Sequence, residues 1–107
     1  MAESLVLTES TYYILLALYT PQHGYGIMQM AEKLSNGRVR LAAGTLYGAL
    51  STMSEKGWIR LLPVEEGSRK KEYQLTDEGL RILKNEIERL RELAANGDLV
   101  LGGNNNG

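Results

Sequence analysis

Apolar residues recur at helical spacing in three segments of the first half of the chain. The first pattern runs from residue 8 to 20 and stops at Pro21, which cannot continue a helix. The second runs from residue 27 to 34, and the third runs from about residue 43 to 56. Gly57 then stands in the C-terminal position that tolerates a positive φ. The first 57 residues therefore predict a bundle of three helices.

The period of the pattern changes after this bundle. Residues 58–64 are rich in β-prone side chains, residues 65–68 have the composition of a turn, and residues 69–75 alternate between apolar and polar positions. These segments predict a β-hairpin. Thr76 is a suitable helix N-cap, and the two acids that follow it suit the first turn of a helix. We expect a last helix from here to about residue 95, ended by Gly97.

The length and composition are those of one soluble globular domain. The chain has 107 residues, of which 43% are hydrophobic and 23% are charged, so it is too short for two cores and too apolar to be disordered. It has no long apolar run and no basic segment leading into an apolar one, so we expect no membrane span, no secretory signal and a cytoplasmic protein. With no cysteine and one histidine, we expect neither a metal site nor a cofactor.

Charge is distributed unevenly along the chain. Between residues 32 and 72 there are eight bases and five acids, whereas from residue 76 onward six acids outnumber four bases. The net charge is only −1. A basic middle and an acidic last helix indicate two surfaces with different partners.

The order of the elements predicts a mainly α (α+β) fold, a winged helix-turn-helix with an added C-terminal helix. In this architecture the third helix enters the major groove of DNA and the hairpin, or wing, touches the flanking backbone. We assign residues 1–75 to the DNA-binding domain, residues 76–96 to a dimerisation helix and residues 97–107 to a flexible tail.

We expect the third helix to be the recognition helix, which contacts the DNA bases. Residues 43–45 begin it with small side chains, which let its free N–H groups approach phosphate or base edges closely. If the apolar stripe of Leu46, Leu50 and Met53 faces the core, the other face points outward. The alternative is that Tyr47 packs beside the wing and that the glycine after it only weakens the helix. The expected DNA contacts on this helix are Gly44, Thr45, Tyr47, Gly48 and Ser51.

The wing carries Arg69, Lys70 and Lys71 directly after a Gly-Ser turn. Three successive bases at a hairpin tip cannot all point inward, so we expect them to contact phosphates, each contact adding about 0.9 to the salt slope of binding. The alternative is a solvated turn balanced by the neighbouring glutamates. Arg38 and Arg40, just before the third helix, are expected to reach the same DNA backbone.

The last helix carries an apolar seam with spacings of three and four residues. Two heptads are too few for an independent coiled coil, so the alternative is packing on the protein's own first helix. A winged domain already has three helices to fill its core, however, and we expect a second copy to cover the seam. A two-fold dimer presents two recognition helices about 34 Å apart, which suits a pseudo-palindromic operator. The expected dimer contacts are Tyr12, Leu16, Leu80, Leu83, Ile87 and Leu90.

Four short motifs lie in order along most of the chain, between residues 7 and 93. They are His23-Gly24-Tyr25-Gly26-Ile27, Gly44-Thr45-Leu46-Tyr47 with Ala49-Leu50, Gly57-Trp58-Ile59, and Tyr73-Gln74-Leu75-Thr76-Asp77-Glu78-Gly79. Together they resemble the PadR family of bacterial transcriptional regulators. The resemblance implies a DNA-binding protein that dimerises through its C-terminal helix and N-terminal region, and it adds Tyr25 to the expected DNA contacts.

The chain departs from the family pattern at two positions. Ala42 stands where a hydroxyl residue that caps the third helix is common, and Gly48 stands where proline often follows the tyrosine. Each change costs the helix roughly 1 kcal/mol, so we expect a recognition helix that is looser when free.

The resemblance also raises the question of a small-molecule effector. Short members of the family include multidrug sensors that hold flat aromatic compounds between their last helices by means of an aromatic residue. The last helix of this chain contains no aromatic residue, and we expect Trp58, at the entry to the wing, to be a core anchor. An effector at the dimer interface therefore stays a hypothesis without an assigned residue.

We predict a homodimeric transcription factor, a repressor that blocks a promoter by occupying it, with double-stranded DNA as its partner. The alternative is a winged-helix module that binds protein, which the pI near 5.8 favours and the basic wing does not. An enzyme is not expected, because His23 lies in a turn with no acid nearby in sequence to orient it, and we assign no catalytic residue.

Overall fold

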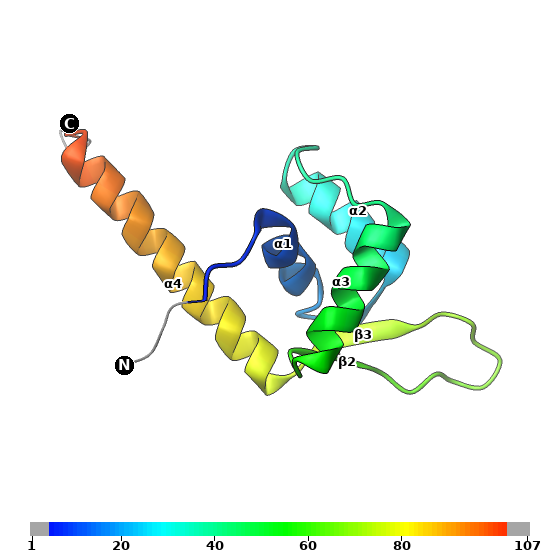
Figure 1. Ribbon diagram of the computed structural model, residues 1–107. Coiled ribbons are helices and arrows are strands. Elements are labelled where there is room, and N and C mark those ends of the chain that lie inside the picture. Colours follow the sequence, from blue (N-terminus) through cyan, green and yellow to red (C-terminus); the bar gives the residue numbers. More distant parts are fainter. Residues whose placement is uncertain (1–4, 103–107) are drawn as a thin grey trace.

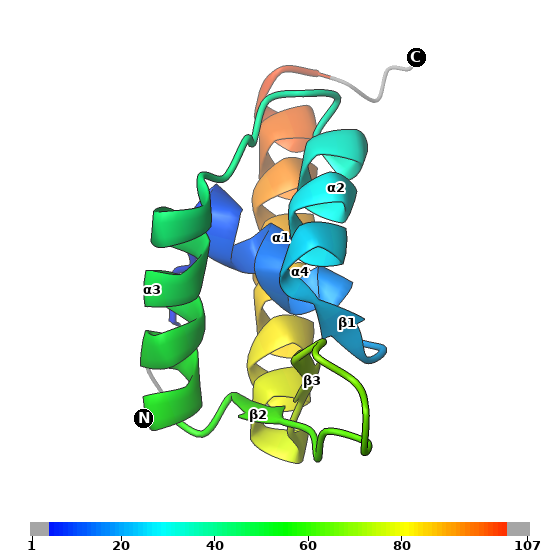
Figure 2. The ribbon, with the colours of Figure 1, turned by 90° about the vertical axis from the view of Figure 1, so that its right-hand side faces the viewer.

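The computed structural model describes residues 5–102, which form four helices and a small antiparallel sheet (Figure 1). The predicted mainly α (α+β) winged helix-turn-helix fold is confirmed. Figure 2 looks onto the side of the molecule that carries α3 and the loop between β2 and β3. The elements are α1 (Glu9–Ala17), β1 (Gln22–His23), α2 (Gly24–Leu34), α3 (Ala43–Glu55), β2 (Ile59–Leu61), β3 (Glu72–Leu75) and α4 (Asp77–Val100).

The sheet has the strand order β1-β3-β2, with both pairs antiparallel. The sequence pattern does not predict β1, because a strand of two residues shows no alternation. The hairpin strands are shorter than the predicted ranges 58–64 and 69–75. Pro63 has no N–H for the ladder, and residues 65–71 have no apolar side chain to bury. Residues 62–71 therefore lie outside the strands, and this loop is the wing.

The core lies where the three short helices meet the sheet. Leu15 of α1, Ile27 of α2 and Leu46 of α3 are completely buried, and Ile59 of β2 packs in the same cluster. The apolar stripes predicted for these helices are thus the faces that pack together. Burying one such side chain contributes about 1.5–3 kcal/mol, and the cluster fixes α2 and α3 relative to each other.

Two hydrogen bonds of Thr76 fix the start of α4. Its hydroxyl oxygen accepts the N–H of Gly79 at 3.1 Å, as expected for an N-cap, and its hydroxyl donates to the carbonyl of Gly57 at 2.6 Å. Gly57 has a φ of +78°, the conformation predicted for it at the end of α3. The helix α4 is therefore tied at its first turn to the end of α3.

The predicted end of α4 at Gly97 is wrong. The helix continues to Val100, and Gly102, with a φ of +75°, follows its last turn. A glycine inside a helix costs only about 1 kcal/mol relative to alanine, which the helix-forming residues around it outweigh. Of the expected tail 97–107, residues 97–100 are helical, and residues 103–107 lie outside the described part of the chain.

The second half of α4 extends beyond the rest of the molecule (Figure 1). All residues from 91 to 100 are exposed. Within residues 5–102, no helix combines the length and the apolar character that crossing a membrane requires.

Candidate nucleic-acid interface

The turn between α2 and α3 is closed by a buried serine. The Ser35 hydroxyl oxygen accepts the N–H of Val39 at 2.8 Å, and the hydroxyl donates to the carbonyl of Glu32 at 3.3 Å. Ser35 is 1% exposed, so both of its hydrogen bonds are made away from water. The two backbone positions with positive φ, Asn36 and Gly37, lie directly after it. This turn holds α3 at a fixed angle to α2.

The helix α3 presents two different faces. Its apolar stripe, Leu46, Leu50 and Met53, is buried, as the spacing predicts. Nothing lies within 4 Å of the space that a side chain at Gly44 or Gly48 would fill, so this surface is open to a ligand. Ala42 makes no side-chain capping bond, which confirms the missing cap. All the α3 residues predicted to contact DNA are exposed: Gly44, Thr45, Tyr47, Gly48 and Ser51.

Tyr47 is half-exposed and does not stand free. A Cβ atom at Gly24 would lie 2.9 Å from the Tyr47 ring carbon Cζ and closer still to the hydroxyl, so the tyrosine packs over the first turn of α2. Tyr25, in the same turn, is 64% exposed. The His23 Nδ1 atom accepts the N–H of Gly26 at 3.2 Å, which makes the histidine the N-cap of α2. The sequence analysis did not predict this capping role, although a histidine directly before the first residue of the helix was the pattern that could have indicated it.

The three wing cations lie together in the exposed loop after Gly67, which has a φ of +84°. Within the loop the Ser68 N–H donates to the Glu65 carbonyl at 3.0 Å, and the Lys70 N–H donates to the Ser68 hydroxyl oxygen at 3.3 Å. Within the same part of the chain, no carboxylate lies within 4.0 Å of Arg69, Lys70 or Lys71. The cations therefore remain available to an external anion.

Arg38 and Arg40, which are also predicted to contact DNA, each face a carboxylate of the chain itself. Arg38 donates two hydrogen bonds to Glu9 at the start of α1, one of them 2.7 Å from Nε to Oε2, and Arg40 lies 3.6 Å from Glu32. Hydrogen bonding to Arg38 lowers the pKa of the Glu9 carboxyl. Both arginines thus have carboxylate partners within the chain.

A groove of about 490 Å³ separates α3 from the sheet. Its floor is apolar, with Leu50 and Ile59, while Ser51, Ser54 and Arg60 supply polar groups along its edges. Sequence reasoning missed Ser54 and Arg60, because their place beside the recognition helix depends on how β2 folds back against α3.

The residues predicted for dimerisation fall into three groups. Leu83 is 3% exposed and belongs to the protein's own core, so its assignment to the surface of the seam is wrong. Tyr12 and Leu16 are half-buried and pack against that core, as Ile87 does. Leu80 is half-buried too, and Leu90 is 38% exposed.

The apolar face of α4 continues past the seam that the sequence predicted. Leu93 is 52% exposed and Leu101 is 87% exposed. With Leu90, Ala94 and Gly97 they lie at the three- and four-residue spacing of a single helix face. The first half of α4 thus packs on α1, and the second half presents an uncovered apolar stripe.

Glu86 joins α4 to the start of the chain. It is 2% exposed, it accepts two hydrogen bonds of 2.7 Å from Arg89, and its Oε2 atom accepts the N–H of Leu7 at 3.3 Å. The hydrogen bonds from Arg89 lower the pKa of Glu86, burial opposes this shift, and the Leu7 N–H lowers the pKa further. The carboxylate is therefore held ionised at the point where the N-terminal segment crosses α4.

We expect Glu86→Gln to destabilise the fold by about 1–3 kcal/mol at pH 7. A carboxyl whose folded pKa lies below its unfolded value of about 4.3 stabilises the fold above that pH, and this contribution is lost as the pH falls through the folded pKa. Urea unfolding should therefore show a difference from the parent that shrinks in acid. Glu88→Gln, which changes an exposed carboxylate of the same helix, is the control. If Glu86→Gln lowered the free energy of unfolding equally at pH 7 and at pH 3, Glu86 would not be a carboxylate that is held ionised in the fold.

Comparison with known proteins identifies one family. Residues 14–85 match the model of the transcriptional regulator PadR-like family. An uncharacterized 37.1 kDa protein in transposon TN4556 of Streptomyces fradiae is 36% identical over 74 residues, a match that covers 69% of this chain. The match covers 20% of that protein, so the chain spans about a fifth of the relative's length.

Solved structures of the same family share the fold. A PadR family transcription regulator from Clostridium difficile superimposes with a TM-score of 0.70 and 26% identity, over 89% of this chain and 100% of that one. Bacillus subtilis PadR, solved in complex with operator DNA, gives a TM-score of 0.61 and 25% identity, over 72% of this chain and 45% of that one. Since the family model matches well over half of the chain and these structures share its winged helix fold, the chain belongs to the PadR-like family, whose members are transcription regulators and not enzymes.

Proposed function

We propose that this chain binds double-stranded DNA as a homodimer in the cytoplasm and represses transcription by occupying a promoter. The observation that carries the proposal is the pairing of two exposed features. One is the open face of α3, where Gly44 and Gly48 leave room for close approach, and the other is the wing with its three exposed cations. A helix in the major groove and a basic wing on the flanking phosphates are the contacts that a winged helix makes with DNA.

Each predicted DNA contact has a role in this proposal. Ser51 and Thr45 offer hydroxyl groups to base edges or phosphates, and Tyr47 and Tyr25 flank the start of α2 with exposed rings. The wing cations bind phosphates without reading the sequence. Arg38 and Arg40 contribute less, because their charge is already matched by Glu9 and Glu32.

Dimerisation is supported by the uncovered stripe on the second half of α4. A lone helix of this kind would expose Leu90, Leu93 and Leu101 to water along one face. A second copy of the same helix covers that face through a two-fold contact. Two recognition helices then lie about one helical turn of DNA apart, roughly 34 Å, so the operator is a pseudo-palindrome.

The related structure with DNA supports the same function. The Bacillus subtilis PadR structure contains operator DNA, and an exposed α3 and wing are what this chain would present to its own operator. Repression follows from mass action, because a dimer seated on a promoter excludes other proteins from it. The competing function is a winged-helix module for protein partners, which the net charge of −1 would suit.

The test is DNA binding by a variant without the wing cations. An operator is first selected from random duplexes with the full chain and then titrated by fluorescence anisotropy at several salt concentrations. Arg69→Ala, Lys70→Ala and Lys71→Ala combined should weaken binding at least about tenfold near 0.1 M salt and lower the salt slope by up to about 0.9 for each lost phosphate contact.

A matched triple variant controls for net charge. Lys33→Ala, Arg81→Ala and Lys84→Ala remove the same charge from α2 and α4, away from the wing, and should leave the salt slope close to that of the parent. If selection returns no sequence bound more tightly than random DNA, or if both triple variants lose affinity equally, the proposal is wrong and the protein-binding module takes its place.

A further inference from the structure

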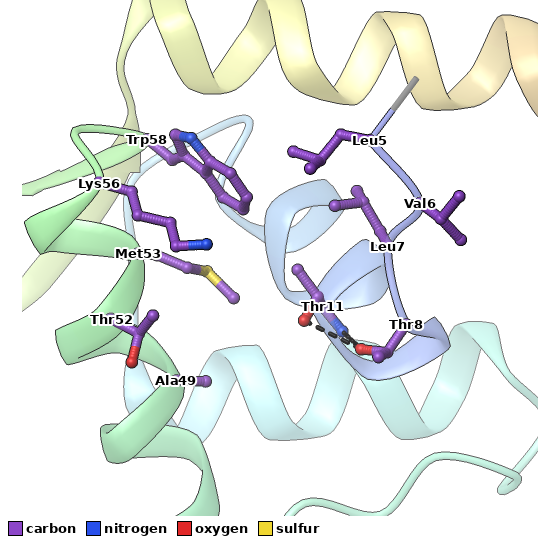
Figure 3. A pocket seen from close by; sticks show the side chains of 10 residues that line it. All are labelled: Leu5, Val6, Leu7, Thr8, Thr11, Ala49, Thr52, Met53, Lys56 and Trp58. Carbon is purple, nitrogen blue, oxygen red and sulfur yellow. Dashed lines mark hydrogen bonds between the residues drawn. The ribbon is translucent and has the colours of Figure 1, made fainter. Parts of the chain in front are cut away.

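A second pocket lies on the side of α3 that faces α1 (Figure 3). It has a volume of about 300 Å³ and is open to solvent on one side. Its walls come from the N-terminal segment, the start of α1, the second half of α3 and the residue that leads into β2. Most of the lining is apolar, with Leu5, Leu7, Met53 and Trp58 among its walls.

One cation is directed into this apolar space. Figure 3 shows the Lys56 side chain running between Trp58 and Met53 with its amine toward the pocket. The amine lies 4.9 Å from the centre of the Trp58 ring, a cation–π distance. Within residues 5–102, no carboxylate oxygen lies within 4.0 Å of Lys56. The lysine is thus an exposed residue that rests against the aromatic ring at the edge of the pocket.

The other polar groups of the pocket are uncharged. Thr8 and Thr11 bond to each other through their hydroxyls at 3.0 Å, and Thr52 adds a third hydroxyl from α3. An apolar cavity with few polar groups is the usual form of a small-molecule site. Here the polar groups favour an anionic head near Lys56, and the walls favour an apolar body.

From these observations we propose that the pocket binds a small amphiphilic anion. Its single carboxylate or similar group pairs with Lys56, and its apolar body fills the space beside Trp58 and Met53. A cavity of about 150 Å³ holds benzene, so this one suits a ligand with about twice as many heavy atoms. Decanoate, a straight-chain carboxylate, has that size. This site is separate from the α4 interface at which the sequence left an effector open.

Trp58 is the only tryptophan of the chain and reports directly on the pocket. Three probes with the same chain and different heads, decanoate, decanol and decylammonium, are titrated below their micelle concentrations while Trp58 emission is recorded. Decanoate should bind about tenfold more tightly than decanol, the difference that one charge-assisted hydrogen bond provides. Decylammonium should bind more weakly than either.

Lys56→Met keeps the length of the side chain and removes its charge. This variant should lose the preference for decanoate while still binding decanol, whereas Lys33→Met, an exposed control on α2, should behave like the parent. Equal binding of all three probes, or a preference that survives Lys56→Met, would overturn the proposal. If a second copy of the chain filled the pocket, Trp58 emission would change on dilution and decanoate would have no effect, which would also overturn it.

The pocket also lies behind the recognition helix. Ala49 and Met53 line it from the side of α3 that faces away from Ser51, and Thr52 lines it from the same face as Gly48, one turn further along the helix. A bound ligand therefore presses on the helix that the proposed function places in the major groove, and this consequence rests on that function. We expect saturating decanoate to change operator affinity at least threefold in the parent and not in Lys56→Met. If the chain binds no operator, the proposed function fails, while the Trp58 titration still decides the ligand site.

Discussion

Leu93→Glu is expected to leave the chain folded and monomeric and to weaken operator binding by more than a hundredfold. Leu93 is 52% exposed within one chain, so a glutamate there costs the monomer little. In the proposed dimer, the same position lies against the partner helix, and a buried unpaired carboxylate opposes association. A monomer binds each half-site independently. It therefore loses the gain in affinity that a dimer obtains from binding two linked half-sites, which is typically 10²–10⁴-fold.

The same helix offers the control for this prediction. Leu99 is 71% exposed and lies six residues further on, so it falls on the side of α4 away from the apolar stripe. Leu99→Glu should therefore leave the dimer intact. Light scattering after size-exclusion chromatography gives the mass of each variant, and anisotropy gives its operator affinity. A dimeric Leu93→Glu chain, or equal disruption by both changes, would show that this face of α4 is not the interface.

Gly79→Ala is expected to destabilise the fold by about 3 kcal/mol, although glycine to alanine inside a helix normally stabilises it by about 1 kcal/mol. Gly79 lies in the first turn of α4, where its backbone rests on the Trp58 carbonyl. An added Cβ would lie 2.9 Å from the Trp58 carbonyl carbon and closer still to its oxygen. Neither backbone can give way, because Thr76 holds both elements together.

Gly97→Ala, in the same helix, is expected to have the opposite effect on stability. No atom lies within 4 Å of the added Cβ, so the substitution should raise stability by roughly 0.5–1 kcal/mol through helix propensity alone. Urea unfolding of the two variants and the parent measures both effects. If Gly79→Ala proved as stable as Gly97→Ala, the close contact between α4 and the entry of β2 would not exist in solution.

The periodic elements of this fold were accessible to sequence reasoning because their signals are local. The stripe at Leu46, Leu50 and Met53 and the cap at Thr76 depend on residues within a few turns, and the structure has both. The misjudged positions depend on tertiary contacts. Leu83 has the same spacing as Leu80, Ile87 and Leu90 on the seam, and only the position of α1 determines that Leu83 is fully buried while the other three are not.

The same difference between local signals and tertiary contacts explains which features of the candidate site were predicted. Exposure of the α3 face followed from helix geometry, since one buried stripe implies an open opposite face. The pairing of Arg38 with Glu9, 29 residues away in the chain, did not follow, because it requires the α2–α3 turn to return to the start of α1. Glu86 gave no signal at all as a glutamate among the charged residues of a helix, and its role depends on the N–H of Leu7.

The hydrogen bonds of Thr76 fix the base of α4, and the far end of this helix joins the two halves of the proposed dimer. A small change of angle at the base therefore moves the far end. A helix of 24 residues is about 36 Å long, so tilting it by about 5° at its base moves its far end by about 3 Å. That displacement is close to the rise of one base pair, roughly 3.4 Å. The spacing of operator half-sites is therefore adjustable by substitutions around Gly79 and Glu86, which touch no DNA, and relatives that differ at this junction would read the same half-sites at different separations.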